Sequence, residues 1–243
     1  MVEVRSKSSG GCLSVLVNAE FLVSVYSCIL GLLKKATSDQ DPLGTLYILT
    51  RKGDVGIKEI YPSRRFTVLR DSHCYIHNYC YLDLTVRVVP ERSFVKLVSN
   101  ELRKRLLDYS LASCHLATLT YKDELHRTGI SLTNVGNCIC KTCTSGAHDC
   151  DVFRRYSQNY LMCFESAENV DKGSALICEQ DSFLGLVTDT VTIDGSNYYV
   201  SVVFLEHLEF SKRVYSAAIS QKFPTAYVFK FYFLWNIITS VSL

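Results

Sequence analysis

Short apolar runs separated by polar turns recur along most of the chain. The clearest pair is 12–17 (CLSVLV) and 22–28 (LVSVYSC), which flank the polar segment 18–20. Such a pair is typical of a β-hairpin. Further short strands are predicted at 45–50, 56–61, 81–88, 114–120, 183–188 and 197–203. With 243 residues, 48% of them hydrophobic, the chain can bury the core of one large β domain or two small ones.

The end of the chain, 216–243, is dominated by aromatic and branched apolar residues from Tyr227 onward. A membrane-spanning helix needs about 20 apolar residues. This run is shorter and contains Lys230 and Asn236. We therefore expect a strand or helix packed on the domain, or a segment that is absent from the mature protein, rather than a membrane anchor.

Charge and cysteine content narrow the class of protein. The net charge is +2 without long charged runs, so nothing favours nucleic acid as a partner. The eleven cysteines indicate a disulfide framework formed in an oxidising compartment. We therefore expect an extracellular, secreted protein, although residues 1–11 show no apolar run of signal-peptide length. The odd number leaves at least one thiol unpaired or paired between molecules.

Two groups of cysteines lie in segments that are predicted to be loops. His73, Cys74, His77 and Cys80 could bind zinc, but a disulfide between Cys74 and Cys80 explains the same residues, and we favour it. The cluster Cys138, Cys140 and Cys143 fits a metal or redox motif and surplus loop cysteines equally well, so we assign it no function. We expect no cofactor and no metal.

Three blocks share a resemblance to one family. Residues 171–178 (DKGSALIC), followed by 184–187 (LGLV), resemble the nucleophile segment of trypsin-like (chymotrypsin-fold) serine proteases. The hairpin 12–28 resembles the block that carries the catalytic histidine, with its two cysteines at the family's separation of sixteen positions. The strand 81–88 is similar to the one that carries the triad aspartate. The blocks look most like the short, divergent trypsin-like proteins of insects.

The resemblance runs from about Cys12 to Tyr215 and implies an all-β fold of two antiparallel barrels. The first barrel is expected at about 12–100, the second at about 111–203, and a short C-terminal helix at about 204–215. The domain would then span 1–215, truncated at its N-terminus, and the apolar extension would span 216–243. The implied disulfides join Cys12 to Cys28, Cys114 to Cys178 and Cys150 to Cys163.

By the same resemblance, the triad-equivalent residues are Ser27, Asp83 and Lys172, in place of histidine, aspartate and serine. Serine has no group that takes up a proton near neutral pH, so the general base is missing. We expect Asp83 to bond to Ser27 or to nearby backbone. We expect Lys172 to reach solvent or to pair with Asp171, because a lysine without a neighbouring base is a poor nucleophile.

The substrate pocket of the family corresponds here to Ser166, Val170, Thr188 and Thr190. Val170 stands where a glycine supplies an oxyanion-binding N–H group, and a β-branched residue is poorly suited to the conformation that a glycine adopts there. Ser166 stands where trypsins carry an aspartate, so no preference for basic side chains is expected.

These residues predict a non-catalytic serine protease homologue, a pseudoprotease, that acts by binding other proteins. Its partner would be an active protease, an inhibitor or a protease substrate, which is an analogy at the level of the fold. One alternative is a trypsin-family endopeptidase with residual or unconventional activity. The other is a degraded gene product without a stable function.

Overall fold

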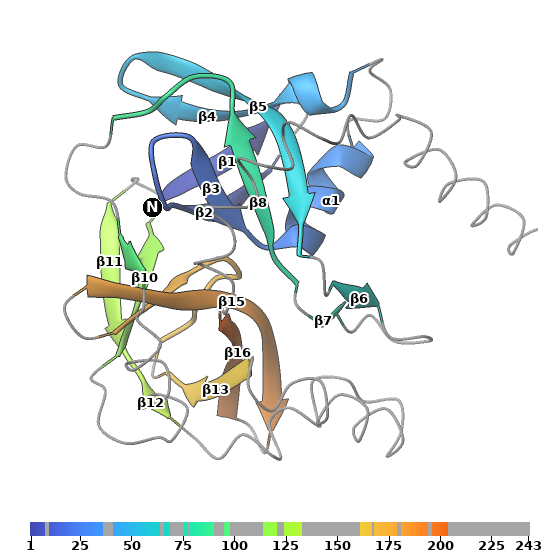
Figure 1. The fold of residues 1–243 in the computed structure, drawn as a ribbon. Coiled ribbons are helices and arrows are strands. Elements are labelled where there is room, and N and C mark those ends of the chain that lie inside the picture. The colour runs from blue at the N-terminus through green and yellow to red at the C-terminus, as the bar shows by residue number, and fades with distance from the viewer. Residues whose placement is uncertain are drawn as a thin grey trace, which may run out of the picture. The chain divides into compact units, whose positions relative to one another are not determined.

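The structure is a computed structural model that describes residues 1–7, 10–35, 41–63, 66–68, 75–76, 78–89, 95–97, 114–120, 124–132, 161–166, 168–178, 181–193 and 196–203. The chain divides into Met1–Phe204 and Leu205–Leu243, and every described residue lies in the first unit. The described part consists mainly of β-strands (Figure 1). Within it, no helix has the length and apolar character needed to cross a bilayer.

The N-terminal half forms a closed, antiparallel β-barrel with the strand order β1-β2-β3-β8-β5-β4. Its strands are β1 (Val2–Ser6), β2 (Gly11–Leu16), β3 (Phe21–Ser24), β4 (Leu46–Thr50), β5 (Gly53–Pro62) and β8 (Cys80–Leu84). A short 3₁₀ helix, η1 (Leu43–Thr45), precedes β4. The pairing of β1 with β4 closes the barrel, so β1 is an integral strand that the sequence analysis did not predict.

The predicted hairpin is confirmed as β2 and β3. The Asn18 side-chain oxygen Oδ1 accepts hydrogen bonds from the N–H groups of Glu20 (2.8 Å) and Phe21 (2.9 Å), which fixes the turn. The second strand is shorter than predicted, because it ends at Ser24 and the helix α1 (Tyr26–Lys35) begins two residues later.

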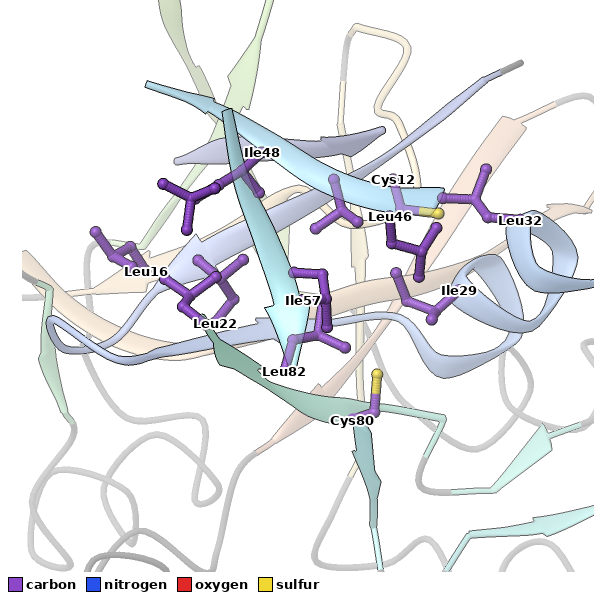
Figure 2. Packing of buried hydrophobic residues seen from close by; sticks show 13 residues of the cluster. Cys12, Leu16, Leu22, Ile29, Leu32, Leu46, Ile48, Ile57, Cys80 and Leu82 are labelled. Carbon is purple, nitrogen blue, oxygen red and sulfur yellow. The ribbon is translucent and has the colours of Figure 1, made fainter. Parts of the chain in front are cut away.

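Apolar side chains from all the strands of the barrel and from α1 form its core (Figure 2). Ile29 and Leu32, three positions apart on one face of α1, point toward Cys12 and Leu46 and cover that end of the barrel. Full burial of such a side chain contributes roughly 1.5–3 kcal/mol. The helix α1 thus contributes to the core of the barrel through these two side chains.

The C-terminal half forms a second sheet with the order β11-β10-β14-β15-β16-β13-β12. Its strands are β10 (His115–Leu119), β11 (Leu125–Gly129), β12 (Ser131–Leu132), β13 (Leu161–Glu165), β14 (Ala175–Cys178), β15 (Ser182–Ile193) and β16 (Ser196–Val203). Only Ile130 separates β11 from β12, so the strands at the two ends of this path are successive pieces of the chain.

Three short strands lie outside these two paths. β9 (Lys96–Leu97) pairs in parallel with the start of β15. β6 (Thr67–Val68) and β7 (Tyr75–Ile76) form a small antiparallel pair of their own. The predicted C-terminal helix at 204–215 and the extension 216–243 lie outside the described residues.

Two of the three predicted disulfides, Cys12–Cys28 and Cys114–Cys178, are confirmed. Cys163 is disulfide-bonded, and its partner lies outside the described residues, so the pairing with Cys150 stays a prediction.

The favoured disulfide between Cys74 and Cys80 is wrong. Cys80 is a free thiol, completely buried, and its sulfur points toward the core of the first barrel (Figure 2). Burial strongly raises the pKa of this thiol, so it stays protonated. Cys80 is thus part of the core, while Cys74, the two loop histidines and Cys138, Cys140 and Cys143 lie outside the described residues.

Candidate functional site

Ser27 is the second residue of α1, and both its backbone and its side chain bind Asn78. The Ser27 N–H group donates to Asn78 Oδ1 at 2.8 Å, and Asn78 Nδ2 donates to Ser27 Oγ at 2.8 Å. The backbone carbonyl of Asn78 also accepts from the Tyr26 N–H group at 3.3 Å. Asn78 is buried, and it anchors the start of α1 from a point 51 positions along the chain. A hydroxyl held by a carboxamide contains no group that takes up a proton near neutral pH.

We expected Asp83 to bond to Ser27 or to nearby backbone, and the contact with Ser27 is not formed, because the Ser27 side chain binds Asn78. The Asp83 carboxylate accepts instead from Lys58 Nζ of β5 at 3.1 Å. Asp83 lies in β8, five residues beyond Asn78, and the two residues have different partners.

Lys172 lies in the turn 171–174, which leads into β14. Its Nζ contacts Asp189 Oδ1 of β15 at 2.8 Å, and both side chains are partly exposed. The lysine thus reaches solvent in part, as expected, but its ionic partner is Asp189 and not Asp171. Asp171 itself is exposed.

The turn around Lys172 is held by backbone hydrogen bonds. The Gly173 N–H group donates to the Val187 carbonyl at 2.8 Å, the Val187 N–H group donates to the Ser174 carbonyl at 2.9 Å, and the Ser174 N–H group donates to the Asp171 carbonyl at 3.1 Å. Gly173 has a φ of +92° and lies directly against the carbonyl oxygen of Leu13 in β2. The turn therefore packs on both β15 and β2.

Tyr199 of β16 binds the backbone just before this turn. Its hydroxyl accepts from the Val170 N–H group at 3.2 Å and donates to the Glu168 carbonyl at 3.2 Å. Among the described residues other than glycine, only Asp181 has a positive φ, so Val170 does not adopt the left-handed backbone that favours glycine. Because its N–H group is already bonded to Tyr199, Val170 offers no unoccupied donor to an oxyanion.

The remaining pocket-equivalent residues lie on separate elements. Ser166 follows β13, and its Oγ accepts from the Glu168 N–H group at 3.3 Å. On β15, Thr188 is buried, while Thr190 is exposed and its N–H group donates to Asp189 Oδ1 at 3.0 Å.

Glu168 connects this region to β11. Its Oε2 lies 2.8 Å from His126 Nε2 and accepts from Thr128 Oγ1 at 2.8 Å. The hydrogen bond from His126, followed by that from Thr128, lowers the pKa of Glu168. Glu168 therefore stays ionised to a lower pH than an ordinary glutamate.

The hydrogen bonds and ion pairs of the three triad-equivalent residues do not join any of the three to another. Ser27 faces Asn78, Asp83 faces Lys58, and Lys172 faces Asp189, so each has a different partner. Within the same residues, no three histidine, cysteine or carboxylate side chains gather as they would around a metal ion.

Comparison with known proteins identifies the fold. Neither a model of a known protein family nor a curated protein matches this chain. Among solved structures, kallikrein-related peptidase 10, in its complex with Zn²⁺, is 15% identical with a TM-score of 0.54, over 89% of this chain and 95% of the peptidase. The VesB protease of Vibrio cholerae is 11% identical with a TM-score of 0.56, over 90% of this chain and 64% of VesB.

This chain has the chymotrypsin fold of the trypsin-like serine proteases. The all-β, two-barrel architecture predicted from the sequence is confirmed. At identities this low, the similarity shows a shared fold and gives no evidence of a shared activity.

The sequence analysis missed two residues that matter within this chymotrypsin fold, Asn78 and Asp189. For Asn78 a signal existed, because the triad aspartate of the family directly precedes its apolar strand, and here Asn78 precedes the buried run 79–84. For Asp189 there was none, since its pairing with Lys172 depends on how β15 lies beside the turn 171–174.

Proposed function

We propose that this protein is a non-catalytic homologue of the trypsin-like serine proteases, located outside the cell, that acts by binding other proteins. The partner would be an active protease, an inhibitor or a protease substrate. The observation that carries the proposal is that Ser27 and Lys172, at the base and nucleophile positions, are each bound to a group that cannot activate them. The Cys12–Cys28 and Cys114–Cys178 disulfides support an oxidising compartment.

The chemistry of these contacts argues against acyl transfer. Lys172 Nζ contacts the Asp189 carboxylate at 2.8 Å, and a lysine ammonium group has no lone pair for attack. The Ser27–Asn78 pair can neither take up a proton nor stabilise an imidazolium. In a well-studied triad, replacing the acid by its amide alone lowers turnover on the order of 10⁴-fold, and here we assign Asn78 to the position of that acid.

A binding role is supported by the edge of β15. From Asp189 to Ile193 this strand pairs with β16 on one side, and the described residues include no strand on its other side. A strand with an unpaired edge can accept an extended segment of another protein through main-chain hydrogen bonds. The ion pair of Lys172 with Asp189 lies at the start of this edge.

The test is a pair of activity assays on oxidised, purified protein. The parent chain is incubated with a serine-directed fluorophosphonate probe and with a mixed peptide library, beside Lys172→Ala. We expect neither labelling nor cleavage in either protein. Peptide cleavage by the parent that Lys172→Ala abolishes would overturn the proposal and make Lys172 the catalytic residue of an unconventional endopeptidase.

Two rebuilt variants test the assignment of Asn78. One carries Ser27→His, Asn78→Asp and Lys172→Ser, and the matched control carries Ser27→His and Lys172→Ser with Asn78 retained. We expect more probe labelling in the triple variant than in the double variant, because only the former has a carboxylate that can orient the new histidine. Equal labelling of the two, at any level above that of the parent, would show that Asn78 is not in the acid position.

A further inference from the structure

We propose that Glu168 is a positioning residue, whose side chain ties the segment 168–172 to β11 and thereby sets where Val170 and Lys172 lie. The proposal rests on polar contacts that converge on this segment. It depends on neither catalysis nor partner binding, so it can fail without affecting the proposed function.

Segment 168–172 belongs to the connection between β13, which ends at Glu165, and β14, which begins at Ala175. Its first residue, Glu168, makes contacts with two strands. The side chain binds β11, and the backbone carbonyl accepts a hydrogen bond from Tyr199 of β16. The same Tyr199 hydroxyl holds the Val170 N–H group. Lys172 follows two residues later and is held by Asp189 of β15. Release of Glu168 would therefore loosen the end of the segment that carries Val170.

The Glu168 carboxylate binds two side chains on one face of β11. His126 and Thr128 are two residues apart, so they project to the same side, and Arg127 between them projects to the other side, where it pairs with Asp181 at 3.6 Å. The other charged groups of the segment and of β15 are Asp171, which is exposed, and Lys172, which pairs with Asp189. Tyr199 of β16 contacts Glu168 only through the backbone carbonyl. Among the described residues, His126 is thus the one cationic partner of the Glu168 carboxylate.

The contacts of Glu168 with His126 and Thr128 depend on its ionised carboxylate. The carboxylate accepts both hydrogen bonds, and protonation replaces the charge with a hydroxyl that must itself donate. His126 and Thr128 lower the pKa of Glu168 in the folded chain. The stabilisation is therefore fully present above the ordinary pKa of a glutamate and is lost as the pH falls through the lowered one.

Amide hydrogen exchange of residues 168–172, corrected for the intrinsic exchange rate at each pH, tests the proposal. At about pH 7 we expect Glu168→Gln to exchange about two- to five-fold faster than the parent, the range expected for an exposed charged contact. The matched control is Glu165→Gln, which removes a nearby exposed carboxylate outside the tie and should leave these rates unchanged. As the pH falls below the ordinary pKa of a glutamate and through the lowered pKa of Glu168, the parent should approach the Glu168→Gln rates.

Two further variants separate positioning from a general loss of stability. Thr128→Val removes one of the two donors and keeps the shape of the side chain, so it should raise exchange in 168–172 by less than Glu168→Gln does. Glu168→Asp, which keeps the charge on a shorter side chain, should restore part of the pH dependence. Equal rates for the parent and Glu168→Gln at about pH 7, or an equal increase in Glu165→Gln, would overturn the proposal.

Discussion

Two buried serines differ in whether their hydroxyl groups have a partner. Ser174, in the turn that carries Lys172, is fully buried, and its Oγ has no hydrogen-bond partner. Ser24 of β3 is also fully buried, but its Oγ donates to the Leu13 carbonyl at 3.2 Å. An unpaired buried hydroxyl costs about 1–3 kcal/mol, whereas a paired one contributes about 1 kcal/mol. The two sites should therefore respond in opposite ways to loss of the hydroxyl.

We predict that Ser174→Ala leaves the free energy of unfolding unchanged or raises it by up to about 1 kcal/mol, because alanine removes a polar group that has no partner. The matched variant Ser24→Ala should lower it by about 1 kcal/mol. Urea unfolding at constant pH measures both. A larger loss in Ser174→Ala than in Ser24→Ala would show that the Ser174 hydroxyl is satisfied.

Gly173 is the residue at which the turn meets the first barrel. Its φ of +92° is costly for any other residue, and a Cβ atom there would lie 2.6 Å from the Leu13 carbonyl oxygen. A positive φ and a steric clash each cost about 1–3 kcal/mol. We predict that Gly173→Ala lowers the free energy of unfolding by about 2–4 kcal/mol, measured by urea unfolding. A loss below about 1 kcal/mol would show that the turn can move away from β2.

At the scale of elements, the start of α1 could not be predicted from the pattern of apolar residues. The run 22–28 extends the hairpin pattern past Ser24, and nothing within it marks the end of the strand. The helix begins where it does because Asn78 binds the N–H group of Ser27 and accepts from that of Tyr26. The start of α1 is thus fixed by a residue that is remote in sequence, which a local pattern cannot reveal.

Gly31 lies in the middle of α1 with open space around the position of a Cβ atom. Glycine in a helix interior costs about 0.5–1 kcal/mol relative to alanine. We predict that Gly31→Ala raises the free energy of unfolding by that amount, measured by thermal or urea unfolding. Gly173→Ala is the contrasting case, because the same substitution meets backbone there. Destabilisation by Gly31→Ala would mean that this face of α1 is covered.

At the scale of the whole molecule, the features predicted correctly were those that repeat locally. The strands at 45–50, 56–61 and 197–203 could be predicted from short apolar runs, and the Cys12–Cys28 disulfide was implied by the resemblance of its block to the trypsin-like family. The pairing of β1 with β4 and the ion pair of Lys172 with Asp189 could not be predicted, because both join segments that only the folded chain brings together. The contact of Asp83 with Lys58 could not be predicted for the same reason, because β5 and β8 are neighbours only in the folded barrel.

The stability of the whole molecule also depends on pH. His115 of β10 has a buried Nε2 atom without a hydrogen-bond partner. Burial, followed by the nearby Arg127 guanidinium, lowers its pKa, although Asp181 opposes this. The unfolded chain therefore takes up a proton at this residue at a higher pH than the folded chain does. Stability contributed by neutral His115 is present above about pH 6.5, the ordinary histidine pKa, and is lost as the pH falls toward the lowered value.

We predict that the parent loses more unfolding free energy between about pH 7 and pH 5 than His115→Gln, which cannot take up that proton. This window lies above the range in which Glu168 titrates, because the pKa of Glu168 is itself lowered, so the two groups can be separated by pH. Urea unfolding at each pH gives the two curves. Parallel curves over this window would mean that His115 has the same proton affinity in the folded and unfolded chains, and that its buried nitrogen is hydrated or paired.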